Sequence, residues 1–274
     1  MKPVSEDCSV AAQPPPQTGS PAGNVRTLPL DLRAFLTREQ HRIHLVGVAG
    51  SGMSGIAALL IELGHTVSGS DKVSTMETDR LQRLGLRFHE QHRPEDASSA
   101  DLIVFSSAIR SDNPILGNAR DAGKAIVRRA EALAAIMRSK RGIVIAGMHG
   151  KTTTSAMTAH VLREGGLHPS HYVGAEIPIL GTNAHWDPRG EYFVAEGDES
   201  DGTVALFHPE HTLVLNIEEE HLDFYADLDA IEKVFAQLIT QTAGKAFYNV
   251  DDKNAARLCR SVTRGISYGF GETS

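Results

Sequence analysis

The sequence predicts an α/β protein with two successive domains, each built around a parallel β-sheet. Short apolar runs alternate with amphipathic segments from Arg42 onward, and this alternation restarts after a polar stretch at 139–142. In each half, a glycine-containing loop directly follows an apolar run, at 47–57 and again at 146–154. Strand–helix alternation at this spacing is typical of parallel sheets with helices on their faces.

The first domain is predicted to span 25–139, after a tail at 1–24. The tail is rich in Pro, Ser, Gly and Gln. We expect it to be disordered, because it cannot bury enough apolar surface to offset the entropy lost on ordering. In the domain itself we predict strands at 42–48, 65–69, 101–107 and 124–127, and helices at 52–63, 76–84 and 130–138.

The second domain is predicted to span 140–274. Its apolar runs again follow one another in the order expected for strands and helices, and we find no internal repeat. We predict strands at 142–147, 191–196, 211–217 and 245–250, and helices at 151–164 and near 227–241.

Composition excludes several classes of protein. The chain has 274 residues and a net charge of −7 with His neutral, and no basic stripe stands out, so nucleic-acid binding is disfavoured. Its two cysteines, Cys8 and Cys259, are too few for a disulfide framework. No window approaches the roughly 18 apolar residues of a membrane span, and the N-terminus lacks the apolar core of a signal peptide. We therefore expect a cytoplasmic protein with neither membrane nor nucleic-acid partners.

The loop at 47–57 has the spacing of a dinucleotide-binding fingerprint. Gly50, Gly52 and Gly55 satisfy G-x-G-x-x-G between a predicted strand and a predicted helix, and Asp71 follows Gly52 by 19 positions. Such glycines allow the backbone to approach a pyrophosphate, and the acidic residue can bind a ribose. The pattern favours a diphosphate ligand over a turn that serves packing alone. It leaves an NAD-dependent oxidoreductase open.

The loop at 146–154 resembles a phosphate-binding loop that lacks its first glycine. The standard motif G-x-x-x-x-G-K-[ST] requires glycine at the position of Ile145. Gly150, Lys151 and Thr152 nevertheless lie at a strand-to-helix turn, where backbone N–H groups favour anions. Lysine can neutralise the β- and γ-phosphates, and the threonine hydroxyl can reach Mg²⁺. A capped helix with a surface lysine is the alternative, but a nucleotide site is favoured.

Carboxylates and a histidine follow the later strands of the second domain. Glu196 ends an apolar strand, where an α/β nucleotide enzyme commonly holds Mg²⁺. Asp198, Glu199 and Asp201 come directly after it, and for each of them we expect a solvated acidic turn. His221 follows another strand end and could meet Glu196 at one metal–phosphate centre.

Five segments, taken together and in order, resemble the Mur ligases of peptidoglycan synthesis: 44–71, 147–154, 181–184, 194–202 and 216–225. The resemblance covers roughly residues 42 to 274. It also explains the unusual loop, because the family typically reads G-T-H-G-K-T there. Gly147 is then in its place, and Met148 replaces the usual threonine.

The resemblance implies two binding sites. The UDP-sugar site would contain Gly47, Gly50, Ser51, Gly52, Met53, Ser54, Asp71, Ser106 and Ser107. The ATP site would contain Gly147, Met148, His149, Gly150, Lys151, Thr152 and Thr153. One Mg²⁺ would be held by Thr152 and Glu196 and a second by His221. Asn183 would lie near the γ-phosphate and the acceptor carboxylate, so that the catalytic residues would be Lys151, Asn183 and His221.

The implied reaction is an ATP-dependent ligation. A member of the alanine-adding branch joins L-alanine to the lactyl carboxylate of UDP-N-acetylmuramate through an acyl phosphate. Sister ligases carry a carbamylated lysine about fifteen residues beyond the histidine that matches His221, whereas Ala236 stands there in this chain. The tripeptide-recycling branch typically reads DEYD where 198–201 reads DESD. Both differences favour the alanine-adding branch.

The family also has a third α/β domain, and no counterpart of it follows in this sequence. We therefore expect an incomplete second domain and a fragment that is inactive alone. Two alternatives stay open, namely an NAD-dependent oxidoreductase and a non-catalytic UDP-sugar-binding module.

Overall fold

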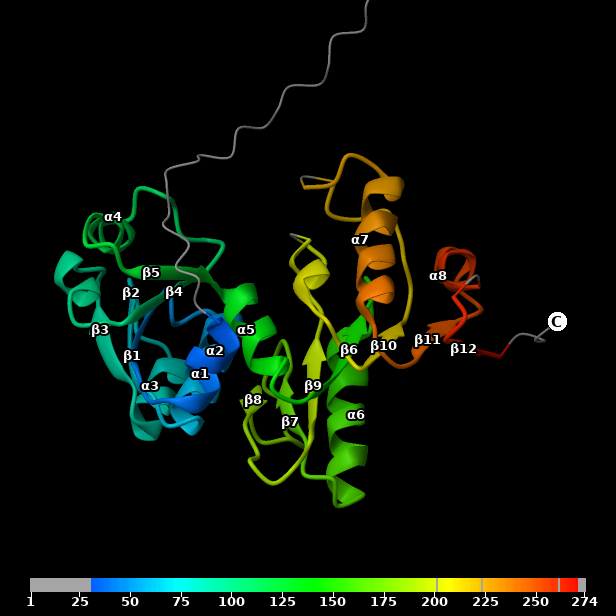
Figure 1. Cartoon of the computed structure of the whole chain (residues 1–274), viewed down its shortest axis with the longest axis horizontal. Helices are drawn as coiled ribbons and strands as arrows, with labels where there is room; N and C mark the ends of the chain where they lie inside the picture. Colours follow the sequence, from blue (N-terminus) through cyan, green and yellow to red (C-terminus); the bar gives the residue numbers. More distant parts are fainter. Residues whose placement is uncertain (1–30, 201, 223, 261, 271–274) are drawn as a thin grey trace, which may run out of the picture.

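Two β-sheets, one in each half of the chain, form the framework of the molecule (Figure 1). The computed structural model describes residues 31–200, 202–222, 224–260 and 262–270, so that the predicted tail at 1–24 lies outside the described residues. Within these ranges all strand pairs are parallel except one, and helices cover the sheets. The predicted α/β fold class is confirmed.

The first sheet has five parallel strands in the order β3-β2-β1-β4-β5. β1 lies at its centre, and four of its five residues are buried because helices cover both faces. The strands are β1 Arg42–Val46, β2 Thr66–Asp71, β3 Arg87–Glu90, β4 Leu102–Phe105 and β5 Ala125–Arg128. The helices are α1 Leu32–Arg38, α2 Ser51–Glu62, α3 Met76–Leu84, α4 Pro114–Asp121 and α5 Arg129–Met137, with a 3-10 turn η1 at Pro94–Ala97.

In the part of the chain that the structure describes, the second sheet has seven strands in the order β12-β11-β10-β6-β9-β7-β8, of which only β7 and β8 pair antiparallel. Its strands are β6 Arg141–Ala146, β7 Ser170–Tyr172, β8 Ala184–His185, β9 Tyr192–Glu196, β10 His211–Val214, β11 Ala246–Asn249 and β12 Gly265–Tyr268. Its helices are α6 Lys151–Glu164, α7 Leu228–Gln241 and α8 Lys253–Cys259, with a 3-10 turn η2 at Thr203–Leu206. The predicted boundary at 139/140 falls between α5 and β6.

The predicted helices have clear local causes. α3 begins at a capping box, in which the Thr75 side chain accepts from the Thr78 backbone and the Thr78 side chain accepts in return. α7 begins where the Asp227 side chain accepts from Ala230 N, and its apolar face buries Ile231 and Phe235. Both helices, and α6, lie where the periodicity predicts them.

Each glycine-containing loop lies at the carboxyl end of a central strand. β1 lies between β2 and β4, and β6 lies between β9 and β10. The chain leaves each central strand and enters a helix, α2 or α6, at the point where the strand order reverses. Ligands of open parallel sheets bind at such points, because the loops diverge there and leave a crevice.

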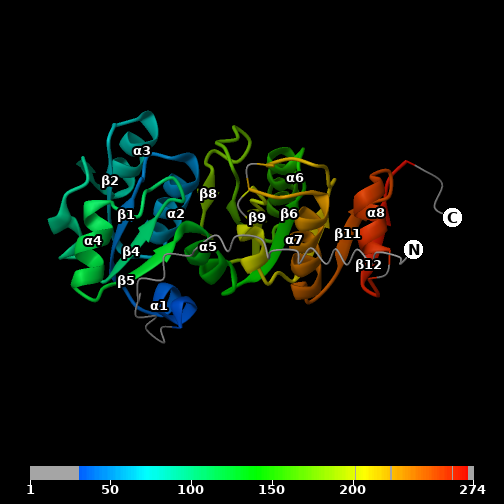
Figure 2. The same ribbon diagram turned by 90° about the horizontal axis from the view of Figure 1, so that it is seen from above.

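The two sheets meet through α2, α5 and the β7–β8 hairpin. Figures 1 and 2 show β8 between α2 and β9. The Glu62 carboxylate at the end of α2 accepts from Trp186 N at 2.5 Å, and one buried apolar cluster contains both Leu59 of α2 and Phe193 of β9. Among the described residues, no helix is long and apolar enough to cross a membrane.

Candidate functional site

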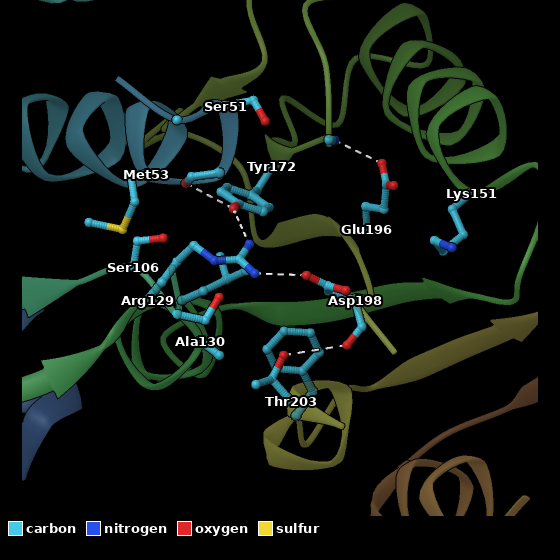
Figure 3. Close-up of a pocket in the computed structure, with 16 residues that line it drawn as sticks. Ser51, Met53, Ser106, Arg129, Ala130, Lys151, Tyr172, Glu196, Asp198 and Thr203 are labelled. Carbon is cyan, nitrogen blue, oxygen red and sulfur yellow. Dashed lines mark hydrogen bonds and ion pairs between the residues drawn. The ribbon is translucent and has the colours of Figure 1, made fainter. Parts of the chain in front are cut away.

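A cavity of about 390 Å³ lies at the junction of the two sheets (Figure 3). Residues of both glycine-containing loops line it, although these loops are about 100 positions apart in the chain. The lining residues predicted from the sequence are Gly50, Ser51, Gly52, Met53, Ser106, Ser107, Lys151 and Glu196. The structure therefore brings the two predicted phosphate sites to one cavity.

Gly52 is tightly enclosed on the cavity side. A Cβ atom there would lie 2.8 Å from Nη1 of Arg129 and 3.0 Å from the hydroxyl of Tyr172. Glycine at this position lets two side chains pack against the first turn of α2. The sequence motif therefore has a packing role in addition to the ligand role that it predicts.

Asp71 braces the first loop. Its Oδ2 accepts from Ala49 N at 2.9 Å and its Oδ1 accepts from Lys72 N at 2.7 Å. It lines a second cavity of about 430 Å³, with Gly47, Thr75 and His92. Both carboxylate oxygens of Asp71 thus bind backbone N–H groups. The predicted contact of Asp71 with a ribose stays a prediction.

Lys151 is held at the start of α6 by three acceptors. Its Nζ donates to Gly147 O at 2.7 Å, to Met148 O at 3.1 Å and to Oε1 of Glu199 at 2.7 Å. Gly147 has φ +147°, and a Cβ there would lie 3.0 Å from Cβ of Leu215, so this position requires glycine. The loop is thus closely fitted around the lysine.

Glu199 is buried, with 2 % of its side chain exposed. Burial raises the pKa of its carboxyl, while the bond from Lys151 acts in the opposite direction. Its Oε2 is buried without a hydrogen-bond partner among the described residues. The expectation of a solvated acidic turn is therefore wrong for Glu199, because η2 and Tyr225 cover this segment: the Tyr225 hydroxyl donates to the carbonyl of Glu199.

Asp198 also turns toward a cation. Its Oδ2 accepts from Nη2 of Arg129 at 2.7 Å, although 39 % of the side chain stays exposed, so Asp198 adds an ion pair to the solvated turn that the sequence predicts. Arg129 and Tyr172 line the cavity, and sequence reasoning missed both. The position of Arg129 directly after β5 was the available signal, since side chains at strand ends face the ligand edge of a parallel sheet. Asp201 lies outside the described residues.

Thr152 and Glu196 form an oxygen pair at the N-terminus of α6. The Thr152 hydroxyl donates to Oε1 of Glu196 at 3.2 Å, and Gly174 N donates to Oε2 at 2.8 Å. Mg²⁺ in nucleotide enzymes is typically held by one or two protein oxygens, substrate phosphates and water, so this pair fits the ion. Within the described ranges, no group of three or more His, Cys, Asp and Glu side chains could hold a metal.

His221 lies beside Glu199 rather than beside Glu196. Its Nε2 is 3.7 Å from Oε1 of Glu199, and its backbone has φ +55°. Its predicted role as a Mg²⁺ ligand stays a prediction.

Asn183 lies at the interface between the two sheets, and it is 4 % exposed. Its Nδ2 donates to Ser51 O at 3.0 Å and to Oγ of Ser54 at 3.1 Å, and its Oδ1 accepts from Arg80 at 3.1 Å. The cavity lining includes neither Asn183 nor Ser54. The geometry indicates an interdomain contact, and a place near the γ-phosphate stays a prediction.

The remaining predicted ATP residues shape the loop. The His149 backbone bonds to the Asn216 side chain in both directions, and its ring is exposed, 3.3 Å from Glu220. Gly150 has φ +81° at the start of α6. Met148 is buried, whereas Thr153 is exposed.

Both halves of the chain match known protein families. Residues 42–141 match the catalytic domain of the Mur ligase family, and residues 145–274 match the Mur ligase middle domain. The two matches account for most of the chain. The chain belongs to the Mur ligase family.

Curated relatives of this Mur ligase carry the name UDP-N-acetylmuramate–L-alanine ligase. The one from Syntrophobacter fumaroxidans is 47 % identical over 237 residues, which are 85 % of this chain and 50 % of that protein. The one from Aquifex aeolicus is 39 % identical over 232 residues, 84 % of this chain and 51 % of that protein. The chain spans about half the length of the curated relatives it matches.

Solved Mur ligase structures share the fold. The UDP-N-acetylmuramate–alanine ligase of Thermotoga maritima has a TM-score of 0.77 at 27 % identity, with 85 % of this chain and 53 % of that chain covered. The UDP-N-acetylmuramate:L-alanyl-γ-D-glutamyl-meso-diaminopimelate ligase of Neisseria meningitidis has the same TM-score at 26 % identity, with 85 % and 79 % covered. The fold is therefore common to both branches of the Mur ligases.

Proposed function

We propose that this chain contains the UDP-sugar-binding and ATP-binding domains of a ligase that joins L-alanine to UDP-N-acetylmuramate. One observation carries the proposal: the glycine loop after β1 and the lysine loop after β6 line the same cavity. A carboxylate on a UDP-sugar bound at the first loop would thereby come near the γ-phosphate of ATP bound at the second. The names of the relatives supply the substrate.

The chemistry requires two anions to approach each other. The lactyl carboxylate oxygen attacks the γ-phosphorus, the bond to the β-phosphate oxygen breaks, and ADP leaves behind an acyl phosphate. Lys151, whose Nζ donates to Gly147 O and pairs with Glu199 in the structure, would neutralise the transferring phosphate. Thr152 and Glu196 would hold a Mg²⁺ ion, which when bound supplies further positive charge against the phosphates.

The second half of the reaction forms the amide. The amine of L-alanine attacks the acyl carbon, inorganic phosphate leaves, and the amine loses a proton to water. Neither half needs a covalent protein intermediate, because positioning and electrostatic stabilisation lower the barrier.

Calorimetric titration with UDP-N-acetylmuramate and with NADH tests the first site. We expect the UDP-sugar to bind and NADH not to bind. Gly50→Asp should weaken UDP-sugar binding at least about tenfold, because it places a carboxylate where the diphosphate would lie. The change leaves room for folding, since the nearest atom to a Cβ at Gly50 is 3.7 Å away.

The matched control is Gly117→Asp in α4, where nothing lies within 4 Å of a Cβ. This variant should bind the UDP-sugar like the unchanged protein. Binding of NADH by the unchanged chain, in place of the UDP-sugar, would assign the loop to an oxidoreductase and refute the proposal.

A further inference from the structure

Arg129 occupies the centre of the cavity. It is the first residue of α5, directly after β5, and its side chain points into the cavity with 16 % of its surface exposed. Figure 3 shows its guanidinium with Ser51, Met53 and Ser106 on one side and Glu196 and Lys151 on the other. A residue of the first domain thus places a cation between the two loops.

The second domain orients this guanidinium. Its Nη1 donates to the Tyr172 hydroxyl at 3.0 Å and its Nη2 donates to Oδ2 of Asp198 at 2.7 Å. The Tyr172 hydroxyl in turn donates to Gly52 O at 2.9 Å, which ties β7 to the first turn of α2. The planar group is therefore held in one orientation by Tyr172 of β7 and by Asp198 in the segment after β9. Such preorganisation reduces the entropy lost when a ligand binds.

The groups around Arg129 indicate which part of a ligand it would bind. Backbone N–H groups at the start of a helix, such as those of α2, suit a diphosphate. Lys151 donates to three protein oxygens and lies at the lysine loop. Lys151 and Arg129 each hold a carboxylate, but the Glu199 side chain is 2 % exposed whereas that of Asp198 is 39 % exposed and lines the cavity. A ligand carboxylate can therefore reach the Asp198 position on Arg129. Arginine is well suited to carboxylates, since it can offer two parallel N–H donors to two oxygens.

We propose that Arg129 recognises the reacting carboxylate of the UDP-sugar, and that this carboxylate replaces Asp198 as the partner of its guanidinium. The proposal rests on the proposed function, because it concerns the acceptor at the same cavity. Arg129 then selects a UDP-sugar that carries a carboxylate over one that does not. Asp198 keeps the guanidinium paired until the substrate arrives.

Two ligands separate this role from diphosphate binding. UDP-N-acetylmuramate and UDP-N-acetylglucosamine differ only by the lactyl group that carries the carboxylate. Arg129→Gln should weaken calorimetric binding of UDP-N-acetylmuramate by about 10- to 100-fold, as expected for a hydrogen bond between charged groups. Binding of UDP-N-acetylglucosamine should change less than about threefold.

Arg128→Gln is the matched control. It removes the same charge one residue earlier, from an exposed side chain, and keeps the backbone bond from Arg128 N to Glu131. Both ligands should bind this variant as they bind the unchanged protein.

Asp198→Asn supplies a second test that does not remove the guanidinium. Because it removes the competing carboxylate, it should tighten binding of UDP-N-acetylmuramate several-fold. This gain should vanish in the double variant Arg129→Gln/Asp198→Asn. A gain that persists there would overturn the proposal.

If Arg129→Gln weakened the binding of both UDP-sugars equally, Arg129 would be assigned to the diphosphate and the proposal would be overturned. Unchanged binding of both UDP-sugars would also overturn it. Circular dichroism and thermal denaturation of each variant check folding. Failure of the proposed function gives a different result, since the unchanged protein would then bind neither UDP-sugar.

Discussion

At the scale of single residues, the contact between Lys151 and Glu199 links the lysine loop after β6 to the segment after β9. The pair is 2.7 Å apart, and the carboxylate is almost fully buried. A buried carboxylate is costly without a cation, so the lysine stabilises the folded chain as well as serving its predicted role toward phosphate. Lys151 is therefore expected to matter in the absence of nucleotide.

Removing the lysine should destabilise the second domain. Lys151→Ala leaves the carboxylate of Glu199 buried without its cation, and we expect a loss of about 3 kcal/mol in the free energy of unfolding. The double variant Lys151→Ala/Glu199→Ala should recover a large part of this loss. Urea denaturation of the unchanged protein, the two single variants Lys151→Ala and Glu199→Ala, and the double variant measures the coupling energy between the two side chains. If the stability losses of the two single variants simply added up in the double variant, the ion pair would not stabilise the folded chain.

At the scale of elements, two strands that are buried within the sheets each contain a buried histidine. The apolar pattern of the sequence does not reveal these residues. His44 in β1 is fully buried, and its ring nitrogens contact the hydroxyls of Ser68 and Ser70 on β2. His171 in β7 is 4 % exposed and faces the carbonyl of Thr182. Burial lowers the pKa of each of these histidines to about 4.

Because of these two buried histidines, we expect the folded protein to lose stability in mild acid. The unfolded chain takes up protons on these histidines near pH 6.5, whereas the folded chain resists protonation until about pH 4. The unfolded state therefore binds more protons in this window, and stability falls as pH falls from 6.5 toward 4. Each histidine contributes up to about 3 kcal/mol over the window.

Urea denaturation at several pH values between 7.5 and 4.5 measures this slope. His44→Gln should flatten the slope, because its amide can face the same serine hydroxyls without titrating. His149→Gln, at a largely exposed ring, is the matched control. An unchanged slope in His44→Gln would mean that other groups dominate the acid response.

The strong elements were predictable from the sequence, and the weak ones were not. α3 and α6 lie where their periodicity indicates, at Met76–Leu84 and Lys151–Glu164, and a capping box also marks the start of α3. β3 was missed because its sequence RFHE is polar at a sheet edge, and β8 because it has only two residues. α4 was missed because Gly117 and Asn118 interrupt its pattern, although Asn113 caps it. Such short segments take their structure from pairing and packing with distant residues.

At the scale of the whole molecule, hydrogen bonds across the two domains set the shape of the cavity. Asn183 bonds to Ser51 and Ser54 of α2, and Tyr172 bonds to Gly52. These contacts hold the glycine loop against the β7–β8 hairpin of the second domain. The relative position of the two loops therefore depends on buried polar groups, which are costly to leave unpaired.

Asn183→Ala tests whether this residue couples the domains. It removes the bonds to Ser51 and Ser54. We expect two separated thermal transitions in calorimetry for this variant and a single transition for the unchanged protein. Asn254→Ala is the control, since it removes a bond to Ile217 O within the second domain alone. It should lower the stability of that domain without separating the transitions. An unchanged single transition in Asn183→Ala, with lost ATP binding, would instead favour the role near the γ-phosphate.

The sequence by itself determined the fold class, the order of the main elements and the two glycine-containing loops that we predict to bind phosphates. Glycine spacing, caps and apolar periodicity act over a few residues, so they can be recognised without coordinates. Only the tertiary structure decided that both loops face one cavity and that Arg129 pairs with Asp198, 69 positions away, and Lys151 with Glu199, 48 positions away. Contacts at such separations depend on how the strands order in the two sheets and on which buried charges find partners, and no local pattern specifies either.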